Sequence, residues 1–132
     1  MPKTAKKPTR SKIVKKLDVI FSQYIRLKYA DKRGMVKCFT CDKVGHWKNG
    51  GIQNGHFRSR RFYATRWSED NCRPQCVRCN MFDSGRAYEF GLKLGEELAQ
   101  KIYLESQQIV KFTTDELIEK INHYSSEVKR MT

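Results

Sequence analysis

The sequence predicts an α+β fold: a central region of short strands and loops held by a metal staple, with one helix before it and further helices after it. Two Cys-x-x-Cys pairs, Cys38/Cys41 and Cys76/Cys79, lie in an irregular stretch with glycines and few large apolar residues. Apolar residues recur at helical spacing on both sides of that stretch. A chain of 132 residues fits one domain with a modest core.

The N-terminal segment divides into a tail and a helix. Residues 1–10 are basic and predict a flexible tail, whereas residues 11–132 predict a single domain. Residues 11–32 predict a helix with Ser11 as its N-cap. The apolar stripe of this helix consists of Ile13, Leu17, Ile20, Tyr24 and Leu27.

Apolar spacing, glycines and capping residues also predict the central and C-terminal elements. Within residues 35–94, the stretches MVKCF and GIQNGHF are the best strand candidates, and a helical pattern begins around Phe82–Ser84. Residues 96–132 predict two more helices, with a break at the glycines before them. Thr113 and Glu116 form a capping box at the start of the last helix.

The charge of the chain favours a polyanionic partner. The formal net charge is +13 and the pI is about 9.7. Residues 1–16 contain seven Lys or Arg and residues 43–68 contain six, with no acid in either stretch. A field of this sign indicates nucleic acid before membrane, although a solvated basic surface is the simpler alternative.

The sequence carries no signal for a membrane or for export. No run approaches the roughly 20 apolar residues that a membrane-spanning helix needs. The start, MPKTAKKPTR, lacks the apolar segment of a signal peptide. We therefore expect a cytoplasmic protein without membrane contact, in a compartment where thiols stay reduced.

The two Cys-x-x-Cys pairs have the spacing of a structural zinc site. Together they supply the four thiolates of a tetrahedral Zn²⁺ site, and each tight turn aims both sulfurs at one point. A redox dithiol is the weaker alternative, because two pairs occur and no βαβ pattern surrounds either. We interpret the fifth cysteine, Cys72, as a small buried residue and His46 as surface or DNA-facing rather than a ligand.

Three polar residues have a distinctive order relative to the two cysteine pairs. His56 lies between the pairs, Asn71 follows it, and Asn80 comes directly after Cys79. This order resembles the His-Me finger nucleases, also called HNH or ββα-metal nucleases. The stretches GHF, ATR and QCVRCN are similar to the NinG/Rap recombination endonucleases of lambdoid phages, over about residues 21–94. The layout also resembles the endonuclease VII resolvases.

The resemblance implies a zinc-stapled ββα-metal core and, with the residue chemistry, assigns roles. His56 is expected to activate water, because an imidazole of ordinary pKa near 6.5 is mostly neutral at pH 7. Asn71 is the candidate that orients the imidazole, and Asn80 offers a hard oxygen to Mg²⁺ or Mn²⁺. Each asparagine could instead cap a turn or a helix. Many such nucleases have an acidic residue where this chain has Gly55, and Asp83 is a weakly supported substitute.

Five arginines are expected to bind DNA phosphates near the scissile bond. They lie between the histidine and the second strand, or within the second cysteine turn. A solvated basic face is the alternative for each of them. These residues are Arg58, Arg60, Arg61, Arg66 and Arg78.

The sequence therefore predicts a structure-specific DNA endonuclease of phage recombination that acts on branched DNA such as Holliday junctions and D-loops. The alternatives are a zinc-stabilised DNA-binding module without catalysis and an HNH nuclease that nicks or cuts duplex DNA. Two symmetric cuts at a junction suit a homodimer. The terminal helices could form its interface, or they could wrap the zinc core of a monomer.

Overall fold

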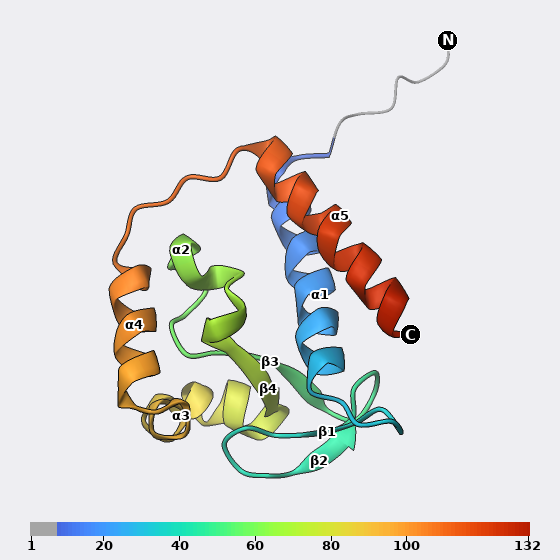
Figure 1. Ribbon diagram of the computed structural model, residues 1–132, viewed down its shortest axis with the longest axis vertical. Coiled ribbons are helices and arrows are strands. Elements are labelled where there is room, and N and C mark those ends of the chain that lie inside the picture. Colours follow the sequence, from blue (N-terminus) through green and yellow to red (C-terminus); the bar gives the residue numbers. More distant parts are fainter. Residues whose placement is uncertain (1–7) are drawn as a thin grey trace.

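The computed structural model describes residues 8–132, which form helices around two small antiparallel sheets (Figure 1). Two long helices, α1 (Arg10–Lys28) and α5 (Thr114–Met131), lie side by side on one flank. The sheets lie below and behind them, and α3 (Ala87–Leu94) and α4 (Glu96–Ser106) complete the opposite flank. The expected α+β class is confirmed, and residues 1–7 of the expected tail lie outside the described part.

The start of α1 corrects the expected cap. Thr9, not Ser11, is the N-cap, because its hydroxyl accepts a hydrogen bond from Lys12 N at 3.3 Å. Ser11 lies inside the first turn of the helix. The capping box of α5 is confirmed: Thr113 Oγ1 accepts from Glu116 N, and Glu116 Oε1 accepts from Thr113 N, both at 3.1 Å.

Helices α1 and α5 run parallel and enclose the larger core. At their starts, the Arg10 side chain donates to the carbonyl of Phe112 at 2.6 Å. Near their ends, the rings of Tyr24 and Tyr124 lie 4.8 Å apart. The core between the helices is apolar and fully or nearly buried, as the sequence periodicity predicts. Its main members are Ile13, Val14, Leu17, Phe21, Ile25, Trp67, Cys72, Leu117, Ile121 and Tyr124.

Four short strands form two separate antiparallel pairs. In the first, β1 (Met35–Lys37) pairs with β2 (Val44–His46). In the second, β3 (Ile52–His56) pairs with β4 (Cys72–Cys76), so that His56 lies opposite Cys72. The two strand candidates of the sequence correspond to β1 and β3. Strand β2 was not expected, because its three residues include a glycine and carry no alternating pattern.

Short helical turns surround the second sheet. The connection from β3 to β4 contains α2 (Tyr63–Arg66) and the 3₁₀ turn η1 (Glu69–Asn71). After β4 come a π-helical turn, η2 (Arg78–Phe82), a 3₁₀ turn, η3 (Ser84–Arg86), and then α3. The α-helix therefore begins later than expected, because the chain first turns through left-handed residues at 84–86. Gly95, with φ of 91°, separates α3 from α4 as predicted.

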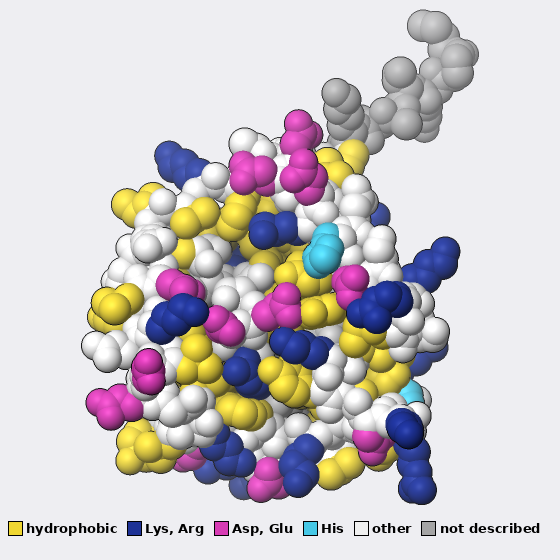
Figure 2. All heavy atoms as spheres, in the orientation of Figure 1, with side chains coloured by type: hydrophobic (Ala, Val, Ile, Leu, Met, Phe, Trp, Pro, Cys, Tyr) yellow, Lys and Arg dark blue, Asp and Glu magenta, His cyan; other side chains and the backbone are white. Residues whose placement is uncertain are grey.

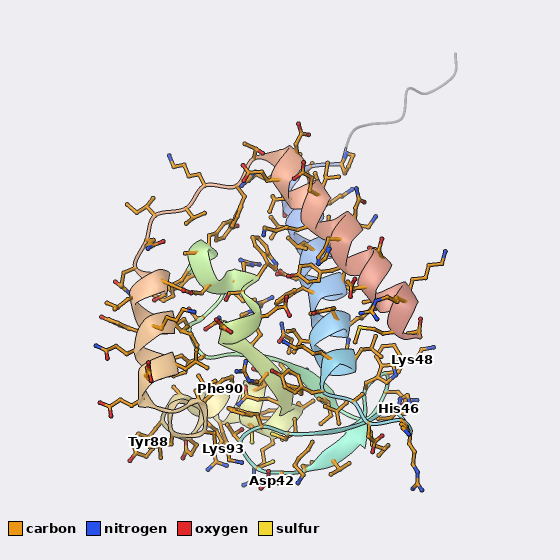
Figure 3. The ribbon with its side chains drawn as sticks, viewed as in Figure 1. Asp42, His46, Lys48, Tyr88, Phe90 and Lys93 are labelled. Carbon is orange, nitrogen blue, oxygen red and sulfur yellow. The ribbon has the colours of Figure 1, made fainter. Side chains whose placement is uncertain are left out.

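Helix α3 covers the sheets with one face and is exposed on the other. Phe90 is fully buried and its ring lies 5.0 Å from that of Phe39, whereas Tyr88 is 75% exposed at the outer edge (Figure 3). Lys93 forms an ion pair with Asp42 in the turn after β1. Among residues 8–132, no helix is both long and apolar enough to cross a membrane.

Candidate metal centre and active-site cleft

The two Cys-x-x-Cys turns bring their four sulfurs together. The Sγ atoms of Cys38, Cys41, Cys76 and Cys79 all lie within 4.8 Å of one another, and no other such cluster of potential ligands occurs in residues 8–132. Four sulfurs about 2.3 Å from one ion in a tetrahedron are separated by roughly 3.8 Å. The cluster therefore fits a tetrahedral metal ion, as expected for structural zinc.

The surroundings favour the thiolate at Cys38, whereas burial and the neighbouring sulfurs raise the pKa of Cys41 to about 12. Burial raises the pKa of the Cys38 thiol, but the N–H of Cys76 and the hydroxyl of Thr40 stabilise its thiolate and bring the pKa down to about 6. Thiolates are the form that binds zinc. Cys41 is exposed and the other three sulfur-bearing residues are buried, so the cluster reaches the surface on one side.

The other two residues considered near the metal have different positions. Cys72 is fully buried in the α1–α5 core, and burial raises the pKa of its thiol, so it remains an uncharged packing residue as expected. His46 is not part of the sulfur cluster; its Nδ1 accepts a hydrogen bond from Lys48 N at 3.2 Å. Both His46 and Lys48 lie at the end of β2 (Figure 3).

His56 is held at one ring nitrogen by a backbone carbonyl. Its Nε2 lies 2.9 Å from the carbonyl oxygen of Arg66, which can only accept a hydrogen bond. In the neutral ring, Nε2 must therefore carry the proton, and Nδ1 has the free lone pair. Burial lowers the pKa of His56 below its ordinary value near 6.5, and the carbonyl contact only partly opposes this effect. The ring is thus neutral at pH 7.

Asn71 does not make the expected direct contact with the imidazole. Its Nδ2 donates to the carbonyls of Arg58 and Thr65, both at 3.0 Å, and its Oδ1 accepts from Arg58 N at 2.7 Å. Asn71 is fully buried, and these bonds tie the segment after β3 to α2. The correction is that the Arg66 carbonyl orients His56, while Asn71 fixes the loop around it.

Arg66 and Asp18 form a buried pair that the sequence analysis missed. Asp18 on α1 accepts from Arg66 through both oxygens, at 3.1 and 2.6 Å, and from Trp67 Nε1 at 3.0 Å. Both side chains are largely buried, at 15% exposure for Arg66 and 17% for Asp18. The guanidinium of Arg66, expected to bind phosphate, is thus paired with Asp18 in this structure.

His56 and Asn80 line the same cleft. This cleft, of about 650 Å³, lies between α1 on one side and β3 with η2 on the other. Asn80 Nδ2 donates to Gln53 Oε1 at 2.8 Å, which leaves the Asn80 amide oxygen as its free acceptor. Gln53 and Asp18 are lining residues that no motif indicated.

The acidic residue that many His-Me nucleases have at the position of Gly55 would collide with Gln75 here. A Cβ at Gly55 would lie only 2.0 Å from Gln75 Oε1. Gln75 is fully buried and donates to Thr40 Oγ1 at 3.0 Å and to the Gly85 carbonyl at 2.8 Å, so it cannot move aside freely. Asp83, the other acidic candidate, is exposed, pairs with Arg78 at 3.8 Å and does not line the cleft.

The remaining arginines differ in how free they are. Arg58 donates to Ser106 Oγ at 3.0 Å and stacks between Phe62 and Tyr103, so it is a structural residue of the α4 contact. Arg60 is 61% exposed and lines the cleft. Arg61 is exposed over Phe62, and Arg78 is 83% exposed. On the face seen in Figure 2, basic, acidic and apolar side chains are interspersed.

The comparisons with known proteins place this α+β chain with its cysteine cluster in a phage family. A family model described as bacteriophage lambda NinG protein matches residues 1–132. The chain therefore belongs to the NinG family. No curated protein and no solved structure matches it.

Proposed function

We propose that this NinG-family chain is a metal-dependent endonuclease that hydrolyses phosphodiesters in branched DNA, such as Holliday junctions and D-loops, during phage recombination. The observation that carries the proposal is the state of His56. A half-buried, neutral imidazole with a protonated Nε2 and a free Nδ1 lines an open cleft beside Asn80. A chain of net charge +13 supplies the attraction for the DNA backbone.

In the proposed reaction, His56 acts as the general base. Its Nδ1 takes a proton from the attacking water, and the Arg66 carbonyl stabilises the resulting imidazolium through Nε2. Because the carbonyl also fixes the ring orientation, the lone pair needs no reorientation during the step. The orienting bond corresponds to the role first expected of Asn71.

Asn80 is the residue proposed to hold the catalytic cation. Gln53 occupies its amide nitrogen, so the amide oxygen is available as a hard ligand. Mg²⁺ or Mn²⁺ bound there would neutralise charge on the phosphate and the leaving oxygen. Since the one carboxylate that lines the cleft, Asp18, is already bound by Arg66 and Trp67, we expect the free protein to bind Mg²⁺ weakly and the DNA phosphate to complete the site. The cysteine cluster has no open position and serves the fold.

The partners in this proposal are DNA and a second copy of the chain. Arg60, Arg61 and Arg78 have exposed guanidinium groups and are assigned to phosphate contacts. Two symmetric cuts at a four-way junction require two active sites, which a twofold dimer provides. Sedimentation with and without junction DNA measures this stoichiometry. The site of action would be the cytoplasm of the host cell.

The decisive experiment compares cleavage of a synthetic four-way junction, a nicked duplex and an intact linear duplex in Mg²⁺. We expect the junction to be cut fastest. His56→Ala should lower the cleavage rate by about 10²- to 10⁴-fold, the usual contribution of a general base, while junction binding and metal content stay normal. His123→Ala is the matched control, because His123 is exposed on α5, outside the cleft.

The alternatives have distinct outcomes in the same assay. A DNA-binding module without catalysis would bind all three substrates and cut none. A nicking or duplex HNH nuclease would cut the linear duplex as fast as the junction. Cleavage by His56→Ala at the wild-type rate would show that His56 is not the base.

A further inference from the structure

Two large apolar side chains are exposed directly after Asn80. Met81 is 62% exposed and Phe82 is 78% exposed, whereas Phe21 and Phe90 are buried. Met81 lines the cleft together with His56 and Asn80. The apolar surface is therefore continuous with the proposed site rather than separate from it.

The backbone holds these two residues outward. They end the π-helical turn η2, which Asp83 N closes by donating to the Arg78 carbonyl at 2.8 Å. Three successive residues, Ser84, Gly85 and Arg86, then have positive φ of 53°, 80° and 50°. Such conformations are unfavourable for non-glycine residues and persist where the surrounding structure maintains them. The bond from the buried Gln75 to the Gly85 carbonyl fixes this segment.

The chemistry around the pair points to DNA bases. Arg78 begins the same turn, is 83% exposed, and pairs at 3.8 Å with Asp83, the residue directly after Phe82. A phosphate held near Asn80 would bring the adjoining bases against Met81 and Phe82. Apolar side chains in this situation insert between base steps or stack on a base that has left the helix.

We propose that Met81 and Phe82 occupy an unstacked base step next to the scissile phosphate and thereby favour branched DNA over continuous duplex. This inference rests on one part of the proposed function, namely that the cleft binds DNA. In a continuous duplex, opening a base step costs stacking energy, whereas at a branch point the stacking is already interrupted. Met81 and Phe82 would therefore bind branched DNA in preference to duplex, because a base step opens at lower cost at a branch point.

The test uses junction and duplex DNA with 2-aminopurine beside the cut position, bound to the protein without added divalent cation. Wild type should raise the fluorescence on the junction, because the labelled base unstacks. Phe82→Ala should abolish the rise and weaken junction binding about tenfold, within the range of one base–aromatic stack, with little change on duplex. Phe82→Trp should retain both effects.

Leu92→Ala is the matched control, since Leu92 is 65% exposed on α3, whereas Phe82 directly follows the cleft residues Asn80 and Met81. An unchanged fluorescence rise with Phe82→Ala, or an equal loss with Leu92→Ala, would overturn the proposal. Conversion of a DNA-free dimer to a monomer by Phe82→Ala would assign the surface to a second copy instead. Because binding is read without cleavage, this result is independent of whether His56 catalyses.

A second and independent observation concerns Asp18. The Arg66 carbonyl that orients His56 belongs to the residue whose guanidinium Asp18 holds through both carboxylate oxygens, and the next residue, Trp67, donates to the same carboxylate. We infer that Asp18 is a positioning residue, which fixes the imidazole through the backbone of residues 66–67. This inference also rests on the proposed role of His56.

Asp18→Asn tests the coupling, because an amide offers one acceptor oxygen where three donors, two from Arg66 and one from Trp67, use the carboxylate. We expect cleavage to fall about 100-fold, as for small misplacements of a reacting group, and the ¹⁵N shifts of the His56 ring to move from one tautomer toward a mixture. Asp70→Asn, which breaks the exposed pair with Lys101, is the control of equal charge change.

The ¹⁵N shifts of the His56 ring are measured in the DNA-free protein. The inference about Asp18 can therefore fail while His56→Ala still abolishes cleavage and supports the proposed function. Unchanged His56 shifts in folded Asp18→Asn would overturn the inference. If that variant does not fold, Arg66→Lys, which keeps the charge but removes the two-point contact, takes its place with the same readouts.

Discussion

The two halves of the molecule are held together by different means. The hydrophobic half, α1 with α5, encloses large apolar side chains such as Leu17, Phe21 and Leu117. The cysteine half, β1 and β2 with the two Cys-x-x-Cys turns, has a buried cluster in which three of five residues are cysteines, beside Val36 and Ile52. We expect apolar burial to stabilise the first half, whereas the second has few large apolar side chains and is expected to depend on a metal bound by its four cysteines.

The candidate cleft takes one wall from each half. Asp18 and Arg26 come from α1, while Gln53 and Asn80 lie beside the second cysteine turn. The site is therefore sensitive to both modes of stabilisation. Variants that weaken only one of the two halves show which half controls the geometry around His56.

The largest effect is expected from loss of a sulfur ligand. Cys38→Ser should abolish stoichiometric zinc binding and unfold the cysteine half, because the free energy of metal binding at such sites is also folding free energy. Zinc content by metal analysis, together with amide NMR spectra, measures both. Normal spectra without zinc would contradict the structural assignment.

Cys72→Ala is the matched control for that experiment. Cys72 is equally buried but packs in the hydrophobic half, so its replacement should leave one zinc per chain. Zinc loss in this variant would mean that the two halves are not separable.

A cavity in the hydrophobic half should have the next largest effect. Leu17 is fully buried, and Leu17→Ala should lower the free energy of unfolding by about 2–5 kcal/mol through lost burial and the cavity left behind. Chemical denaturation measures the change. Zinc content should remain unchanged, and a variant that also released zinc would show that the halves unfold as one unit.

A smaller effect is expected where the second sheet approaches the cysteine half. Gly55→Ala would force Gln75 away from Thr40 and Gly85, and a buried polar group left without a partner costs about 1–3 kcal/mol. Thermal denaturation with and without chelator compares the damage in each half. If stability is unchanged, Gln75 can move and Gly55 is not required by packing.

The smallest effect is expected in the pH dependence of the cleavage rate. Burial lowers the pKa of His56, so the ring stays neutral at pH 6.5 and the rate should decline only at lower pH. The unfolded chain, with the ordinary pKa, gains its proton first, so stability is also lost as pH falls below 6.5. A pH–rate profile with its acid limb above pH 6.5 would contradict the burial of the ring.

The elements with local signals were predictable from the sequence. Helical spacing gave α1, α4 and α5, the box of Thr113 and Glu116 gave the start of α5, and the paired cysteines gave the metal cluster. Each of these signals spans only a few turns or a short motif. The helices do not depend on distant partners, and the two cysteine pairs, although far apart in the sequence, identify each other by their shared spacing.

The contacts that the sequence did not predict depend on residues brought together only by the tertiary fold. The sequence assigns Arg66 to phosphate, whereas in the structure its partner is Asp18. This pairing could not be predicted, because Asp18 lies 48 residues earlier and no pattern links the two. Asn71 was assigned to the imidazole, although its amide is satisfied by carbonyls that only the folded loop brings close. The identity of a polar residue predicts the bonds it can make, but tertiary packing determines which groups receive them.

The parallel pairing of α1 with α5 also has a consequence for the order of events during synthesis. Translation produces α1 first, whereas its partner, Thr114–Met131, leaves the ribosome only after the whole intervening chain. The sulfur ligands lie between residues 38 and 79, so they can capture zinc while the growing chain is incomplete. The apolar face of α1 must meanwhile stay unpaired, which exposes it to chaperones until α5 closes over it.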